Sequence, residues 1–188
     1  RPAHGRAQRL AADRVRALKP RVLLFLLALW SSPGVLAQAL PELELKATYA
    51  YNFAALTLWP AAARTTFNFC AYGDEGVAEA MRRLEGKTLH GRSVTVARLR
   101  SLSAIRDCDL LYVGANEASS LPQIAALLGD APVLTVTDAP PPQQAAVVIV
   151  AEGKRLAFEI DVERCHRAGL KPGASLLGLA RNLRRPAS

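Results

Sequence analysis

The chain has 188 residues, of which 51% are hydrophobic, 21% charged and 6% aromatic. This apolar content supports a packed core and excludes an intrinsically disordered chain, and the absence of a Gly or Pro period excludes collagen-like repeats. The net charge of +8 arises mainly from residues 1–39, which hold seven Lys or Arg and one acid. The other 17 basic and 15 acidic residues nearly balance, so the composition does not indicate nucleic-acid binding.

A basic leader precedes an uninterrupted apolar run over residues 22–30. A Ser-Ser-Pro-Gly break at residues 31–34 follows, and small residues then lead to Ala37 and Ala39. This order is typical of a cleavable signal peptide. The alternative, a membrane anchor, needs about 20 apolar residues, more than this run provides. We therefore predict that residues 1–37 are a signal peptide, with cleavage after Ala37 or Ala39.

Helices and strands are expected to alternate along the remaining body, residues 38–188, which we expect to form a single domain. Apolar residues at three- and four-residue steps predict a helix over 42–59, ended by Pro60. Further strands are predicted at 66–72, 93–99, 109–114 and 132–138, a hairpin at 147–160, and helices after Asp74 and over 119–128, 162–168 and 175–183. We therefore predict an α/β three-layer sandwich, with a mostly parallel sheet of five or six strands and an antiparallel C-terminal hairpin at its edge.

Three cysteines, Cys70, Cys108 and Cys165, lie in the predicted exported domain. An oxidising compartment favours pairing, and an odd count leaves one cysteine over. Cys70 lies in the first predicted strand and Cys108 just before the third, and such strands are often neighbours in this kind of sheet. A Cys70–Cys108 disulfide is therefore preferred, with two buried thiols as the alternative. Cys165 would then be a free thiol or an intermolecular link.

Few residues indicate catalysis or metal binding. Outside the leader there are two His, and the sequence has no H-x-x-x-H, C-x-x-C, G-x-S-x-G or phosphate-binding glycine motif. Ligands of open α/β sheets bind beyond the carboxyl ends of the strands, and the polar residues expected there are Asp74, Asn116, Glu117, Thr137 and Asp138. These form a candidate small-molecule site, although polar residues are also ordinary at loop ends.

Aromatic residues of the first helix are candidates for binding a partner protein. They are Tyr49, Tyr51 and Trp59. Packing in the core is the alternative for at least half of them. From the residues alone, the sequence indicates a secreted α/β binding or regulatory domain rather than an enzyme, with no metal and no cofactor.

Several stretches lie in an order and spacing that resemble one known family. They are 45–53 with Trp59-Pro60, 69–74, 89–94, the strand after Cys108, 134–138, 156–161, and 168–170 before 175–180. The body of the chain is thereby similar to the YfiR-like periplasmic family. The family pattern also has cysteines at the positions of Cys70 and Cys108. This chain departs from it at Ala145-Ala146, where Gly-Gly is common, at Asp161, where Asn is usual, and by lacking a second cysteine pair.

The resemblance implies a periplasmic regulator that is often a homodimer. Its best-known members hold an inner-membrane diguanylate cyclase inactive through the cyclase's periplasmic sensor domain, and an outer-membrane lipoprotein relieves that inhibition. Such a protein lowers cyclic-di-GMP and biofilm formation, and is not inserted in the membrane after cleavage. The alternatives are a small-molecule sensor that uses the strand-end residues and, less favoured, an exported hydrolase.

Overall fold

The computed structural model describes residues 36–61, 64–141, 143–153 and 155–184. Most of the predicted signal peptide lies outside these residues, so its cleavage stays a prediction. The described residues from Ala39 onward form one compact unit by their internal contacts.

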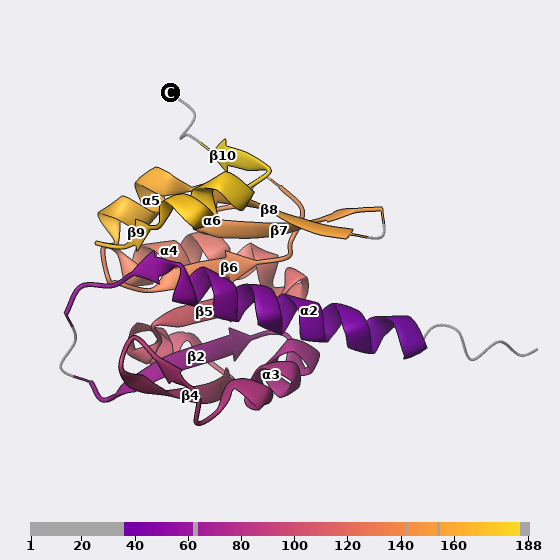
Figure 1. The fold of residues 1–188 in the computed structure, drawn as a ribbon, viewed down its shortest axis with the longest axis horizontal. Helices are drawn as coiled ribbons and strands as arrows, with labels where there is room; N and C mark the ends of the chain where they lie inside the picture. The colour runs from indigo at the N-terminus through magenta and orange to yellow at the C-terminus, as the bar shows by residue number, and fades with distance from the viewer. Residues whose placement is uncertain (1–35, 62–63, 142, 154, 185–188) are drawn as a thin grey trace, which may run out of the picture. The chain divides into compact units, whose positions relative to one another are not determined.

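A central sheet organises the described part of the chain. Its strands lie in the order β10-β8-β7-β6-β5-β2-β4-β3 (Figure 1). They are β2 (Thr66–Tyr72), β3 (Thr88–Leu89), β4 (Arg92–Leu99), β5 (Leu110–Val113), β6 (Leu134–Thr137), β7 (Val147–Glu152), β8 (Arg155–Asp161) and β10 (Asn182–Arg184). A separate antiparallel pair joins β1 (Thr57–Leu58) to β9 (Lys171–Pro172).

The pairing within the sheet is mostly parallel. Strands β4, β2, β5, β6 and β7 run parallel to one another, and β7 and β8 form an antiparallel hairpin. The α/β fold class predicted from the sequence is therefore confirmed, but the described sheet has eight strands rather than the predicted five or six. The hairpin is not the outermost element, however, because β10 pairs in parallel with β8. Strands as short as β3 and β10 carry too few residues for a sequence period to reveal them.

Helices cover both faces of the sheet. They are α2 (Leu36–Ala55), α3 (Glu75–Met81), α4 (Leu121–Leu128), α5 (Val162–Arg167) and α6 (Ala174–Leu179), with 3₁₀ turns η1 (Arg82–Leu84), η2 (Leu102–Asp107) and η3 (Ala115–Ser120). One core contains buried residues of α2, α3, α5 and α6, and a second contains those of η2 and α4. Figure 1 shows α2 crossing in front of the strands. The arrangement is the three-layer sandwich that the sequence predicted.

The first helix begins at Leu36 rather than at residue 42. The predicted C-terminal ends of two helices are also wrong, and tertiary contacts explain both. The first helix ends at Ala55 rather than Trp59, because Thr57 and Leu58 extend into the pairing with β9. The last helix ends at Leu179 rather than Leu183. There the backbone N–H of Arg181 donates to Phe158, and the chain continues as β10 beside β8.

Candidate functional site

The five strand-end residues predicted as a ligand site lie at the carboxyl ends of β2, β5 and β6. Asp138 joins two of these ends, since the backbone N–H of Ala115 donates to its Oδ1 at 2.9 Å. Asp74 is the N-cap of α3 and accepts from the N–H of Val77 at 2.9 Å. The buried Thr137 hydroxyl donates to the carbonyl of Val113 at 2.7 Å. Three of the five side chains therefore already form hydrogen bonds within the protein: Asp74, Thr137 and Asp138.

The space between the ends of β2 and β5 is tightly filled. A Cβ on Gly114 would lie 2.9 Å from the carbonyl oxygen of Gly73, and one on Gly73 would lie 2.1 Å from Cγ of Glu117. Gly73 also has a φ of 76°, which favours glycine. Asn116 is exposed beside this contact. A ligand at the junction of β2 and β5 would have to displace Glu117.

Lys46 of α2 lies at the neighbouring carboxyl ends of β5 and β6. The sequence pattern did not point to this residue. Its Nζ lies 2.7 Å from Oδ2 of Asp138 and 2.9 Å from Oε1 of Glu42, and the residue is 9% exposed. Burial alone would lower the pKa of Lys46, but hydrogen bonds and charges from Asp138 and Glu42 outweigh it and raise the pKa above its usual value. Its partner Asp138 is 92 positions away, so sequence spacing gives no signal of the contact.

Tyr112 of β5 lies beneath the same cluster. It is fully buried, and its hydroxyl has no hydrogen-bond partner among the residues that the structure describes. Burial, followed by the negative charges of Asp138 and Asp74, raises the pKa of Tyr112 strongly, so the hydroxyl stays neutral. The carboxyl edge is therefore a buried polar cluster that attaches α2 to the sheet.

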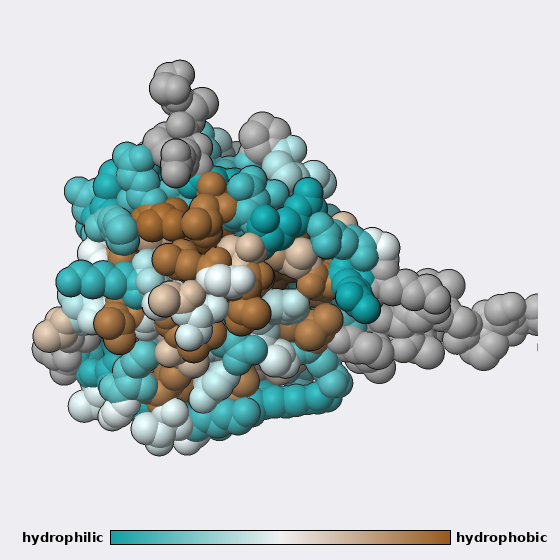
Figure 2. Space-filling model, turned by 45° about the horizontal axis from the view of Figure 1, so that its top comes forward, coloured by the Kyte–Doolittle hydropathy of each residue, from teal (hydrophilic) through white to brown (hydrophobic). Residues whose placement is uncertain are grey.

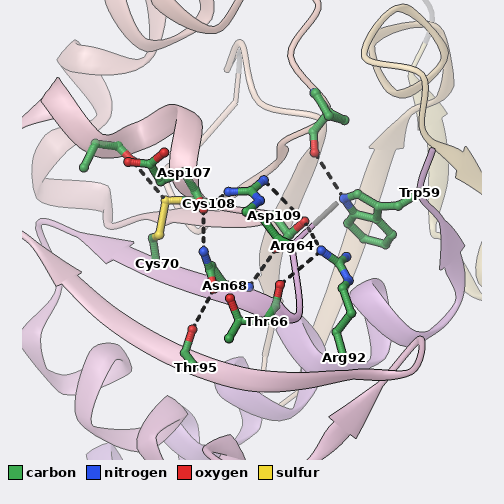
Figure 3. Close-up of polar contacts among 12 residues, drawn as sticks. Trp59, Arg64, Thr66, Asn68, Cys70, Arg92, Thr95, Asp107, Cys108 and Asp109 are labelled. Atoms are coloured by element: carbon green, nitrogen blue, oxygen red, sulfur yellow. Dashed lines mark hydrogen bonds and ion pairs between the residues drawn. A yellow bond between two sulfur atoms is a disulfide. The ribbon is translucent and has the colours of Figure 1, made fainter. Parts of the chain in front are cut away.

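The disulfide preferred from the sequence is present. Cys70 of β2 is bonded to Cys108, whose Cα lies 5.8 Å from that of Cys70 (Figure 3). Both cysteines are buried, and β2 and β5 are neighbouring strands, as the prediction assumed. Cys165 is a buried free thiol, and burial raises its pKa to about 12. At neutral pH this thiol is protonated and unreactive.

A charged network adjoins the disulfide at the amino end of β5. Asp109 is 2% exposed, and its Oδ1 accepts from Nη1 of Arg92 at 2.9 Å while its Oδ2 accepts from the N–H of Asn68 at 2.8 Å (Figure 3). Nη2 of Arg64 lies 3.8 Å from the same Oδ1. Asn68 also donates to the carbonyl of Asp107 at 2.7 Å. Together, the disulfide and Asp109 hold β2, β4 and β5 at fixed positions.

The three aromatic residues predicted to bind a partner are each half-buried. Tyr49 donates its hydroxyl to the carbonyl of Leu156 at 2.8 Å, and its ring lies 5.6 Å from that of Phe53. Trp59 donates its indole N–H to the carbonyl of Pro132 at 3.1 Å. The ring of Tyr51 lies under the ammonium group of Lys87, 5.3 Å from the ring centre. Their intramolecular contacts give all three a structural role, and their exposed edges leave partner binding as a proposal.

Apolar side chains gather on the face that carries α2 and α6 (Figure 2). Leu58 of β1 and Leu179 of α6 are 61% and 69% exposed, and Leu45 of α2 is 41% exposed. The backbone N–H of Gly173, just before α6, donates to Leu56, just before β1, at 2.8 Å, which brings these elements together. We name Leu45, Leu58 and Leu179 the α2–α6 face. Exposed apolar surface of this kind is typical of protein-binding sites.

Comparison with protein families identifies the chain. A family model described as YfiR/HmsC-like matches residues 43–181, from within α2 to the residue before β10. The chain belongs to the YfiR/HmsC-like family. The resemblance noted in the sequence is thereby confirmed. No curated protein matches the chain. Family membership supports a periplasmic regulatory protein in cyclic-di-GMP signalling that has a protein partner.

Two of the departures from the family pattern, at Ala145-Ala146 and at Asp161, lie where the structure gives each residue a defined contact. Ala145 and Ala146 are buried where the chain enters β7, and the guanidinium of Arg184 donates to the carbonyl of Ala145 at 2.6 Å. Asp161 is the N-cap of α5 and accepts from the N–H of Arg164 at 2.8 Å. An Asn can cap a helix in the same way, so this substitution preserves the local structure.

Within 36–184, apart from the gaps given above, no three His, Cys, Asp or Glu side chains are placed to hold a metal ion. In the same part of the chain, no helix has the length and apolar character to cross a membrane.

Proposed function

We propose that this protein is a periplasmic repressor that binds the periplasmic sensor domain of an inner-membrane diguanylate cyclase and holds the cyclase inactive. The observation that carries the proposal is the YfiR/HmsC-like match over residues 43–181. The basic leader with its short apolar run supports export, and the α2–α6 face supports docking of a protein. In this proposal, the half-exposed Tyr49, Tyr51 and Trp59 contribute to the contact.

The proposed mechanism is a shift of population. A repressor turns a two-state enzyme off only by binding the inactive state more tightly than the active one, and a near-complete switch needs about 5 kcal/mol of preference. A homodimer would present two copies of the docking face. An outer-membrane lipoprotein that binds the repressor would release the cyclase by competition.

The direct test measures binding of the mature protein to the full-length cyclase in detergent or nanodiscs. Leu179→Asp places a charge in the α2–α6 face and should weaken binding at least tenfold. Leu127→Asp is the matched control, because Leu127 is an exposed leucine, 42% exposed, on α4, which packs in the other core. Absence of binding by the unmodified protein, or equal losses in both variants, would reject the proposed docking face.

A redox input is part of the proposal. If the Cys70–Cys108 disulfide is needed to keep the repressor folded, a reducing periplasm would release the cyclase. The buried network around Asp109 supports this, because it lies on the segment that the disulfide attaches to β2.

The alternative proposal is a small-molecule sensor that uses Asp74, Asn116, Glu117, Thr137 and Asp138. Lys46 and Glu117 occupy this edge, so a ligand would have to displace them. Calorimetric titration with nucleotides and amino acids tests it. Binding heat that disappears in Asp138→Asn would favour the sensor, and no heat with any of these ligands would remove it.

A further inference from the structure

The outer edge of β4 is open over the second half of the strand (Figure 1). β3 pairs with β4 only at Arg92 and Ser93. One residue further on, the N–H of Val94 donates to the carbonyl of Lys87 at 2.8 Å, and the carbonyl of Val94 accepts from the N–H of Gly86 at 3.0 Å. From residue 95 onward, no strand in the described part of the chain pairs with this side of β4.

The backbone groups of two residues point out of this open edge. Successive residues of a strand direct their N–H and carbonyl groups to opposite sides, so Val96 and Arg98 point the same way as Val94, away from β2. The edge therefore presents two N–H donors and two carbonyl acceptors that have no partner among the described residues. Unpaired groups in this arrangement are a template for a further strand.

A groove of about 300 Å³ lies between α3 and this edge. Ala78 and Val96 supply its apolar surface, and its charged lining is Glu75, Glu79, Arg82 and Arg98. Arg98 forms an ion pair with Glu75, and Nε of Arg82 lies 3.8 Å from Oε2 of Glu79. Because side chains alternate along a strand, a strand added to β4 would place every second side chain in this groove.

Charge decides which strand fits. Residues 75–100, which include α3, η1, β3 and β4, hold six Lys or Arg and three Glu. Lys87 and Arg100 lie at the two ends of the open stretch, and neither forms an ion pair with a described residue. A second copy of the chain would bring two basic edges together, and like charges on facing strands are destabilising. We propose that the open edge of β4 binds an extended acidic segment of another protein by strand addition.

The test is a titration of the isotopically labelled mature protein with a capped synthetic peptide, Glu-Thr-Glu-Thr-Val-Thr, followed by NMR. Antiparallel to β4, the peptide places its valine opposite Val96 and its two glutamates opposite Arg98 and Arg100. Binding should slow the hydrogen exchange of the Val96 and Arg98 amides. The amides of Thr95 and Ala97 point toward β2 and should keep their exchange rates.

Two control peptides separate strand addition from simple charge attraction. A peptide with lysine in place of both glutamates should bind at least tenfold more weakly. A peptide that is N-methylated at its valine and its second glutamate keeps the charge but lacks the two N–H donors, and it should also bind at least tenfold more weakly. Arg98→Glu should reverse the preference between the acidic and the lysine peptide. Arg167→Glu is the matched control, because Arg167 is an exposed arginine of α5, which follows β8 elsewhere in the sheet.

The proposal is overturned if the acidic peptide does not bind the unmodified protein at millimolar concentration. It is also overturned if the N-methylated peptide binds equally well, or if Arg167→Glu weakens binding as much as Arg98→Glu. Slow exchange of the Val96 and Arg98 amides that appears without peptide, as the protein concentration rises, would overturn it in favour of a second copy. The measurement needs no cyclase, and none of the residues of the α2–α6 face lines the groove, so its result is independent of the proposed repressor function.

Discussion

Removal of the Cys70–Cys108 disulfide is the perturbation whose effect follows most directly from the structure. The two cysteines are 38 positions apart, and the loop between them contains α3, β4 and η2. In the chain-entropy account, a disulfide that closes a loop of this length stabilises the fold by about 4 kcal/mol, because it restricts the unfolded chain. The double variant Cys70→Ala/Cys108→Ala should lose roughly this amount.

For a domain of about 150 residues, a loss of this size lowers the melting temperature by on the order of 10 °C. The measurement is thermal unfolding followed by circular dichroism, with and without a thiol reductant. The unmodified protein should lose a similar amount of stability on reduction, whereas the double variant should not respond to the reductant. Cys165→Ala serves as the control, because Cys165 is buried but forms no disulfide.

The reasoning is refuted if the double variant melts within about 2 °C of the unmodified protein. The proposed redox input is refuted separately if the destabilised variant still represses the cyclase fully at 37 °C. These two results distinguish a disulfide that matters for stability alone from one that also controls signalling.

Three further predictions concern buried charges and the free thiol. Asp109→Asn leaves two guanidinium groups without their shared carboxylate, so it should lower the free energy of unfolding, measured in urea, by about 3 kcal/mol. Asp107→Asn is the control at an exposed side chain and should change this free energy by less than about 0.5 kcal/mol. Lys46→Met should cost about 3 kcal/mol at pH 7, because it leaves the largely buried carboxylate of Asp138 without its cation. The pKa of Lys46 is raised in the folded state, so the stability that Lys46 contributes is complete below about pH 10.5 and is lost as pH rises through the folded-state pKa. Lys46→Met should therefore lose less stability in alkali than the unmodified protein does. Equal losses in the two proteins would contradict this assignment. Ellman's reagent should find no reactive thiol in the native oxidised protein and one after denaturation, from Cys165; a thiol that reacts before unfolding would show that the residue is accessible.

The sequence predicts the layers of this fold because its longer elements carry a clear period. The continuous apolar run around β6 is typical of a strand covered on both faces, and Leu134–Thr137 is buried at every position. The disulfide was predictable for a related reason, because strand order followed from the alternation of strands and helices. The ends of α2 and α6 were not predictable, since pairing with β9 and β8 overrides the local preference of a few residues.

The candidate site was also predictable from the sequence only in part. The sequence places Asp74 and Asp138 at one edge of the sheet, because both follow parallel strands. It does not show that Lys46 reaches Asp138, since that contact depends on how α2 crosses the sheet. The pairing of Arg92 with Asp109 cannot be read from the sequence either, because it also depends on the tertiary fold. An acid directly before an apolar strand does indicate that a buried partner exists.

Cyclic-di-GMP in living cells gives the most direct test of the central proposal. A reporter strain would produce the membrane cyclase alone, with the full chain, or with a chain that lacks residues 1–37. The proposal predicts that cyclic-di-GMP falls only when the full chain is exported, and that Leu179→Asp restores it while Leu127→Asp does not. An unchanged level with the exported protein, or an equal fall with the form retained in the cytoplasm, would contradict repression from the periplasmic side.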